Sequence, residues 1–294
     1  MHAPIPKKQT VEPIPPVAAQ EPHLLNEHGR QRMDPYAWMR LSEAQREARV
    51  PDAHTRKVID HLNAENAYTD QMLAPMKELR AKLFQEMKGR IKETDMSVPY
   101  RENGYWYGSR YEEGREYAIH MRAPVGVEKD VTPAELTDIL DENKLAEGHT
   151  FFDLGDFEIS PGNGIAAYSV DTVGRRQYTV RFRDLRTGED LADTITHTSG
   201  GGAWADDRTF FYARKDRTLR SYKVFRHILG TGQEQDVEVY HEKDAAYSCE
   251  VYRSRSDRFV IDQFRKHAQQ RQPAAAGERA VGHLHAVHPA GARA

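Results

Sequence analysis

The sequence predicts a mainly β protein with a helical segment near its N-terminus. Two observations predict the β part: strand-like stretches show period-two alternation, and a strand–turn–strand unit recurs between Phe157 and Ile261. The repeat is about 45 residues long, the size of a four-stranded propeller blade. A β-sandwich with coincidental spacing stays open as the alternative, because two and a half copies are few. The helical part is predicted by apolar residues at spacings of three and four between Asp52 and Gly89.

The repeated unit is most complete in its first copy. Three strands are expected there, at 157–161, 165–170 and 177–185, joined by a Gly-Asn-Gly turn and a charged hairpin. The later copies supply strands at 209–213, 221–227, 249–252 and 258–261. An aromatic stretch at 98–122 predicts three more strands, which would form a first blade, and 133–145 is expected to be a short helix or a connection. The chain is therefore expected to hold an incomplete β-propeller over 96–262.

The preceding helical segment, 23–95, is expected to hold two helices. Pro75 interrupts the apolar stripe because proline cannot continue a helix, and Gly89 is the expected C-cap. The stripe consists of Val58, Ile59, Leu62, Tyr68, Met72, Leu73, Met76, Leu79, Leu83 and Met87. No comparable helical stretch follows, so this stripe is expected to need a partner. Upstream, a short turn or helix after Asp34-Pro35 should dock Tyr36 and Trp38, and the Pro-rich residues 1–22 are expected to be a disordered leader.

The character of the sequence changes after Ile261. Residues 263–294 are rich in Ala, Gln, Arg, His and Gly, and the strand period stops in mid-blade. We therefore expect a disordered tail and hypothesise that the reading frame was lost near Ile261; a genuine disordered extension is the alternative. His283, His285 and His288 lie in this tail without an accompanying carboxylate or thiol, so no metal site is expected.

Composition narrows the classes of function. The 294 residues carry a net charge of −3, so a general nucleic-acid binder is not expected. No apolar run approaches membrane-spanning length, and no signal-peptide core follows Lys7 and Lys8. The single cysteine, Cys249, allows no disulfide within the chain and is expected to be a small core residue. These features predict a cytoplasmic protein with no membrane partner and no cofactor.

Several short motifs, taken in order, resemble the prolyl oligopeptidase family of serine peptidases. They are Asp34-Pro35-Tyr36-Ala37-Trp38-Met39, Glu65-Asn66-Ala67-Tyr68, Ser160-Pro161, Ala167-Tyr168-Ser169, Tyr178-Thr179-Val180, Asp184-Leu185 and Thr187-Gly188-Glu189. Within the family the likeness is strongest to oligopeptidase B, through Met87-Lys88-Gly89-Arg90-Ile91-Lys92-Glu93, Ser97-Val98-Pro99, Tyr105-Trp106-Tyr107 and the stretch 221–231. The resemblance extends from Pro22 to Ile261, and it depends on the order and spacing of the motifs together.

The resemblance implies a two-domain serine peptidase with an α/β-hydrolase catalytic domain. A seven-bladed propeller covers the active site of such enzymes and admits only short peptides, and oligopeptidase B members cleave after Lys or Arg. In the family the N-terminal helices pack against the hydrolase domain, which would give the apolar stripe a partner in cis or in trans. Short peptides would then bind only when that domain is present.

The sequence departs from the family at the catalytic residues. No Gly-x-Ser-x-Gly nucleophile motif occurs in it, and Thr198-Ser199-Gly200-Gly201-Gly202 is expected to be a glycine-rich loop between blades. We therefore carry over no catalytic, cofactor-binding or metal-binding residue. The expected fold is mainly β with an N-terminal helical segment and a partial seven-bladed propeller, without the α/β-hydrolase domain.

Three functions are compatible with these observations. The first is the N-terminal part of an oligopeptidase B-like serine endopeptidase, inactive alone because nucleophile, base and oxyanion hole act as a unit. The second is a free-standing propeller-like binding module, which a soluble monomer would favour, whereas aggregation or rescue by a separate hydrolase part would favour the first. The third is an enzyme in its own right. Scattered acids and histidines, such as His149 with Asp153 and His241 with Glu242, allow it, but such pairs are mostly solvated surface.

Overall fold

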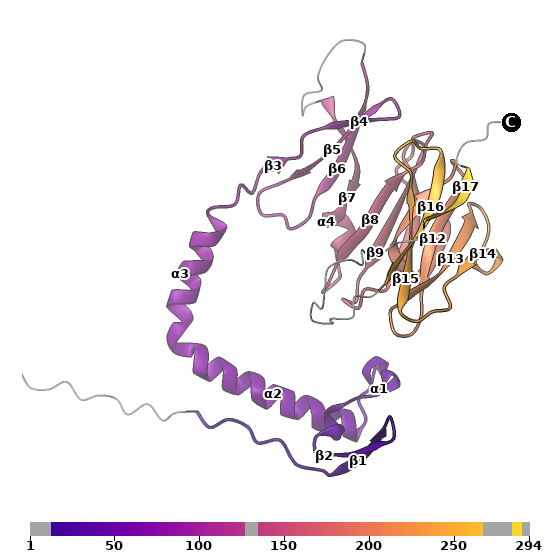
Figure 1. The fold of residues 1–294 in the computed structure, drawn as a ribbon. Coiled ribbons are helices and arrows are strands. Elements are labelled where there is room, and N and C mark those ends of the chain that lie inside the picture. Colours follow the sequence, from indigo (N-terminus) through magenta and orange to yellow (C-terminus); the bar gives the residue numbers. More distant parts are fainter. Residues whose placement is uncertain (1–12, 127–134, 267–283, 290–294) are drawn as a thin grey trace, which may run out of the picture. The chain divides into compact units, whose positions relative to one another are not determined.

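The computed structural model describes residues 13–126, 135–266 and 284–289, with side chains up to residue 263. The chain divides into two units, Met1–Lys92 and Glu93–Ala294. The first unit is helical with one hairpin, and the second consists of antiparallel strands (Figure 1).

The N-terminal unit contains the two predicted helices. Its elements are β1 (His23–Glu27), β2 (Arg30–Asp34), η1 (Ala37–Met39), α1 (Glu43–Glu47), α2 (Ala53–Leu73), η2 (Ala74–Met76) and α3 (Lys77–Lys88). Helix α2 begins after Asp52, whose carboxylate accepts the Thr55 N–H at 2.6 Å as an N-cap. Pro75 lies in the 3-10 turn between α2 and α3, and Gly89 caps α3. The interruption and the C-cap are therefore where the sequence predicts them.

Trp38 anchors the short 3-10 turn η1, as predicted for the Asp-Pro motif. It is 9% exposed, and its indole N–H donates to the Ala19 carbonyl at 2.7 Å. Tyr36, predicted to dock beside it, remains 41% exposed. The Glu21 N–H also donates to the Pro35 carbonyl at 2.8 Å. Ala19 and Glu21 are thus held by hydrogen bonds to the Trp38 indole and the Pro35 carbonyl, in contrast to the disordered leader expected up to residue 22.

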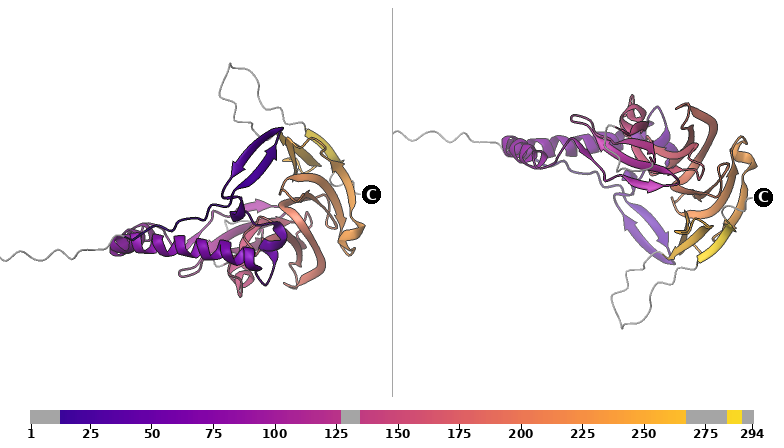
Figure 2. Two further views of the ribbon diagram at one scale, coloured as in Figure 1. Left: turned by 90° about the horizontal axis from the view of Figure 1, so that it is seen from below. Right: turned by 90° about the horizontal axis from the view of Figure 1, so that it is seen from above.

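The second unit contains three antiparallel sheets, of which the seven-stranded one comprises two successive blades. A five-stranded sheet comprises β3 (Asp95–Met96), β4 (Tyr100–Glu102), β5 (Tyr105–Tyr111), β6 (Ile119–Pro124) and β7 (Thr137–Asp141), followed by α4 (Glu142–Ala146). A seven-stranded sheet comprises β8 (Asp153–Ile159), β9 (Ile165–Asp171), β10 (Tyr178–Asp184), β11 (Asp190–Trp204), β12 (Thr209–Lys215), β13 (Ser221–Ile228) and β14 (Val237–His241) in chain order. A three-stranded sheet comprises β15 (Tyr247–Arg253), β16 (Phe259–Lys266) and β17 (Leu284–Pro289). The seven-stranded sheet twists strongly, and β15 packs against its β11–β13 part (Figures 1 and 2).

Strand β11 joins two blades into one sheet. Its first half pairs with β10, and its second half pairs with β12, for example Gly202 opposite Tyr212. The glycines at 200–202, predicted to form a loop, lie inside this strand. A Cβ on Gly202 would come within 2.1 Å of the Phe210 ring, and a Cβ on Gly200, whose φ is +102°, would come within 2.9 Å of the Tyr178 ring. Glycine is needed here because neighbouring rings cross close to the strand, so the loop prediction is wrong.

Aromatic residues form the centre of the seven-stranded sheet. Phe182, which is fully buried, lies edge-on to Trp204 and Phe210, with ring centroids 5.6 Å and 5.4 Å away. A second cluster joins this sheet to the next blade and consists of Ala203, Ala205, Phe211, Val224, Cys249, Val251 and Val260. Each predicted strand of the repeat corresponds to an observed strand, and alternate residues of these strands build the two clusters.

Two stretches differ from the sequence expectations. The stretch 133–145, expected to be a helix or connection, contains β7, the last strand of the first blade, and the short helix α4; residues 127–134 lie outside the described part. Strand β16 continues to Lys266, and β17 lies within the expected tail of 263–294. The hypothesis of a lost reading frame stays a prediction.

Candidate functional site

The first strands of successive blades lie side by side and form one surface. The Gly202 N–H of β11 donates to the Asp156 carboxylate of β8 at 3.2 Å. The indole N–H of Trp204 donates to the Glu158 carbonyl at 3.1 Å. In a propeller such first strands line the centre, so side chains that project from them meet there.

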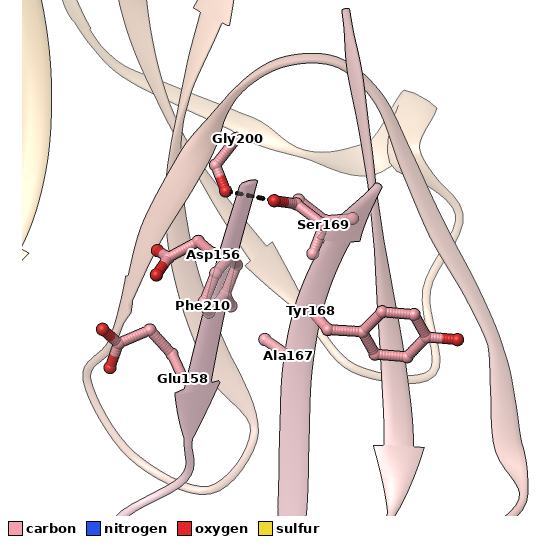
Figure 3. A pocket seen from close by; sticks show the side chains of 8 residues that line it. Asp156, Glu158, Ala167, Tyr168, Ser169, Gly200 and Phe210 are labelled. Carbon is pink, nitrogen blue, oxygen red and sulfur yellow. Dashed lines mark hydrogen bonds between the residues drawn. The ribbon is translucent and has the colours of Figure 1, made fainter. Parts of the chain in front are cut away.

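Two acids project from β8 into this surface. Asp156 and Glu158 are two residues apart, so both point to the same face of the strand, as Figure 3 shows. Burial raises the pKa of Asp156, and the N–H groups of Gly202 and Phe157 oppose that shift by donating to its carboxylate. Two main-chain N–H groups therefore fix the orientation of the Asp156 carboxylate.

Glu158 has the most strongly perturbed carboxylate of this surface. Burial by the neighbouring strands, then repulsion from Asp156 and Glu102, raises the pKa of Glu158 to about 8, and Arg253 opposes the shift. The side chain nevertheless remains exposed to solvent, so water reduces the energetic cost of its charge. Glu102 at the end of β4 also has a raised pKa, from burial and then from Asp257. The surface therefore concentrates acids that would gain from a cationic neighbour.

The hollow behind these acids is too small to hold a ligand. It has about 150 Å³ of empty space and no room for a water molecule. Its lining consists of Asp156, Glu158, Ala167, Tyr168, Ser169, Val180, Gly200 and Phe210 (Figure 3). The Ser169 hydroxyl donates to the Gly200 carbonyl at 2.6 Å and is buried. A serine committed in this way is a structural residue.

The described residues contain no arrangement for nucleophilic catalysis. Among them, no hydrogen bond joins a serine or cysteine to a histidine, and no group of three His, Cys, Asp or Glu residues is placed to hold a metal ion. Cys249 is fully buried, and burial raises the pKa of its thiol to about 12, so it is a core residue as predicted. His283 lies outside the described residues, and so do the side chains of His285 and His288.

Neither acid–base pair considered from the sequence is formed. No hydrogen bond or ion pair between His149 and Asp153 occurs in the described structure, and Asp153 instead accepts the Tyr178 hydroxyl at 2.6 Å. The imidazole of His241 lies 3.8 Å from Glu238 rather than beside Glu242. An enzyme built on these pairs therefore has no support in the geometry.

A buried histidine that the sequence did not single out lies between two acids on blade three. His227 is fully buried, with Nδ1 2.7 Å from Asp236 and Nε2 3.2 Å from Asp193. Burial alone would lower its pKa, but the hydrogen bonds and charges of Asp236 and then Asp193 outweigh burial and raise it. The strand pattern places His227 on the inward face, whereas the acids lie on separate segments, so only the fold reveals the charge network.

Comparison with known proteins identifies the family. Residues 15–273 match the family model of the prolyl oligopeptidase N-terminal β-propeller domain. The chain belongs to the prolyl oligopeptidase family. A family model that covers these residues confirms both the resemblance read from the motifs and the propeller interpretation of the repeat, and it excludes the β-sandwich alternative. In the part of the chain that the structure describes, no helix is long and apolar enough to cross a membrane.

Individual relatives agree with this assignment. Dipeptidyl aminopeptidase BI of Pseudoxanthomonas mexicana is 41% identical over 273 residues, which are 88% of this chain and 36% of the relative. Protease 2 of Moraxella lacunata is 27% identical over 84% of this chain and 34% of its own length. Oligopeptidase B from Leishmania major superposes with a TM-score of 0.76 at 32% identity, over 86% of this chain and 36% of that one. Oligopeptidase B from Trypanosoma brucei, in a closed form with covalently bound antipain, superposes with a TM-score of 0.73 at 32% identity. The match covers 85% of this chain and 35% of that one. The chain thus spans about a third of the length of the relatives that it matches.

Proposed function

We propose that this chain is the N-terminal propeller part of an oligopeptidase B-like serine endopeptidase that hydrolyses short peptides after Lys or Arg, and that it is inactive alone. The match of residues 15–273 to the family's propeller model carries the proposal. The proposed inactivity is supported by the sequence, which contains no Gly-x-Ser-x-Gly motif. A cytoplasmic location is part of the proposal and is supported by the single, buried, unpaired cysteine.

The partner proposed for the chain is an α/β-hydrolase domain, in cis or in trans. An unpaired apolar face on α3 supports it: Leu79, Leu83, Phe84 and Met87 are 46–59% exposed. The residues Lys77, Arg80, Ala81, Leu83, Phe84 and Met87 line a hollow of about 590 Å³. A soluble helix normally buries such a stripe, so this face is suited to pack against a further domain.

The acids on the first strands support a preference for cationic peptides. The charges of Asp156 and Glu102 both raise the pKa of Glu158, so the three acids place negative charge close together. A Lys or Arg side chain, or a peptide amino group, would relieve this repulsion. In the intact enzyme such a surface would favour the entry of basic substrates.

A domain exchange tests the proposal. Residues 15–266 of this chain would replace the matched segment of the Pseudoxanthomonas relative, which retains its own remaining sequence. We expect the chimera to hydrolyse short peptides after Lys or Arg, and this chain alone to hydrolyse none of them. Because that relative is named for the release of dipeptides, each peptide would be offered with a free and with a blocked N-terminus. The proposal would be refuted if a folded chimera cleaved no peptide after Lys or Arg, or if the isolated chain were active. If the chimera only released dipeptides from free N-termini, the assignment as an endopeptidase would be wrong.

A further inference from the structure

Two hairpin loops and a connecting segment enclose a basic hollow on the second unit. The hollow has a volume of about 370 Å³ and is lined by Arg176, Lys215, Thr218, Leu219, Arg220 and Ala245. Arg176 lies in the loop between β9 and β10, Lys215 ends β12, and Arg220 lies just before β13. We propose that this basic hollow binds a small oxyanion of the phosphate type.

The two loops that shape the basic hollow are each organised around one aspartate. Asp171 is buried and accepts the N–H groups of Val173, Gly174 and Arg176 at 2.9, 3.0 and 2.6 Å. Asp216 accepts the N–H and the hydroxyl of Thr218 at 2.8 and 2.6 Å. Both carboxylates thus accept hydrogen bonds from their own loops. The loops are therefore preorganised by these hydrogen bonds.

Two of the three cations of the hollow have no carboxylate partner among the described residues. The Lys215 ammonium donates to the Arg176 carbonyl at 2.5 Å and lies 5.3 Å from the centre of the Tyr178 ring. The Arg176 side chain forms no ion pair within the described part of the chain. Burial, and then the charge of Arg176, lowers the pKa of Lys215, and Asp171 opposes the shift. Lys215 and Arg176 therefore place two positive charges close together at the hollow.

Arg220 completes the hollow as a fixed wall. Its guanidinium donates to the carbonyls of Asp244 and Tyr247 at 3.1 and 2.8 Å and lies 3.4 Å from the Asp216 carboxylate. Because Arg220 lines the same hollow, its positive charge would add to those of Arg176 and Lys215 in attracting an anion. Arginine and lysine together favour oxygen-rich anions of double charge over a single carboxylate. Phosphate is therefore the probe, and acetate distinguishes a carboxylate site from a phosphate site.

The test measures phosphate binding to the 294-residue chain by calorimetry at constant ionic strength. The variants are Lys215→Met and Arg176→Asn, the latter because asparagine tolerates the positive φ of 54° at this position. The matched control is Arg186→Gln. The Arg186 side chain is 84% exposed and forms an ion pair with Asp184 in its own hairpin. We expect saturable phosphate binding to the parent and the control, at least about tenfold weaker binding to both variants, and weaker binding of acetate to the parent.

A second measurement separates specific binding from general salt effects. The pKa of Lys215, followed by NMR in ¹³C-lysine-labelled protein, should rise when phosphate binds, because an adjacent anion favours the ammonium form. The absence of saturable binding, equal binding by all four proteins, acetate binding as tight as phosphate binding, or a Lys215 pKa that phosphate leaves unchanged would each overturn the proposal.

Discussion

The buried charge network of His227 allows a stability prediction that depends on pH. In the variant His227→Phe the cation between Asp193 and Asp236 is lost, while an aromatic ring still occupies the site beside Phe182, whose ring lies 5.6 Å away and nearly parallel. Two hydrogen bonds to charged groups contribute about 1.5–3 kcal/mol each. Removing one partner of a buried ion pair costs about 3–5 kcal/mol, because the remaining charge is left uncompensated. We expect a loss of this size in the free energy of unfolding at acidic to neutral pH.

The sign of the pH dependence follows from the direction of the pKa shift. The His227 pKa is raised above its ordinary value of 6.5, so the folded state binds the proton more tightly than the unfolded state. The stabilisation is fully present below pH 6.5 and is lost as the pH rises through the folded pKa. The difference in stability between the parent and His227→Phe should therefore be larger at about pH 6 than at about pH 9.

Urea unfolding measured by tryptophan fluorescence provides the assay, since Trp204 is 1% exposed in the same core. The control His241→Phe changes a half-exposed histidine on the adjacent strand and should alter stability by about 0.5 kcal/mol or less. A difference between parent and His227→Phe that is below about 1 kcal/mol, or that grows with rising pH, would refute the reasoning.

Three further changes test the junctions between blades and the acidic surface. Asn163→Ala removes a side chain that accepts one hydrogen bond and donates another to the first blade, at 2.6 and 2.7 Å, and should destabilise the chain by about 1–3 kcal/mol in urea unfolding. Gly202→Ala should cost about 1–3 kcal/mol, because its Cβ would come within 2.1 Å of the Phe210 ring. Asp156→Asn removes a like charge and should lower the pKa of Glu158 from its value of about 8, as measured by NMR titration.

Each of these changes has a matched control or a contrary outcome. Gly164→Ala adds a Cβ that meets nothing within 4 Å, and Asn26→Ala changes an exposed asparagine; both should be near neutral. If Gly202→Ala were as stable as Gly164→Ala, the close packing of β11 would be incorrect. If the Glu158 pKa stayed unchanged in Asp156→Asn, crowding alone would explain its shift.

The sequence predicts those strands that are rich in apolar residues and largely buried. Strands β9 and β12 each contain four consecutive buried residues, β10 and β13 are partly buried, and each of these strands was expected within a few residues of its observed bounds. By contrast, β1, β2 and β14 are mostly exposed on both faces, so they show no period of two and were missed. The first half of β11 was also missed, although its residues alternate in burial. Its glycines were read as a loop because their close packing depends on rings from other strands.

The candidate site could be predicted only in part. A pair of acids two residues apart, such as Asp156 and Glu158, is typical of any solvated strand face. The raised pKa of Glu158 depends on burial, on Asp156 and on Glu102 from the first blade, and that of Asp156 depends on burial. The charges around His227 likewise come from segments 9 and 34 residues away. The local sequence pattern therefore predicts the face of the strand on which each side chain lies. The charges around that side chain can be known only once the blades are assembled.

The same distinction governs how the blades hold together. Within a blade, paired strands are neighbours in sequence, so short-range patterns specify them. Between the first and second blades, the polar contacts join residues 41 to 63 positions apart, through Tyr107, Arg122 and Asn163. Between the second and third blades the contact is different, because strand β11 continues through both and keeps one hydrogen-bonded sheet. Since a continuous sheet is disrupted only by breaking main-chain ladders, the second and third blades form the cooperative centre of the unit, and the first blade is attached to it mainly through side chains.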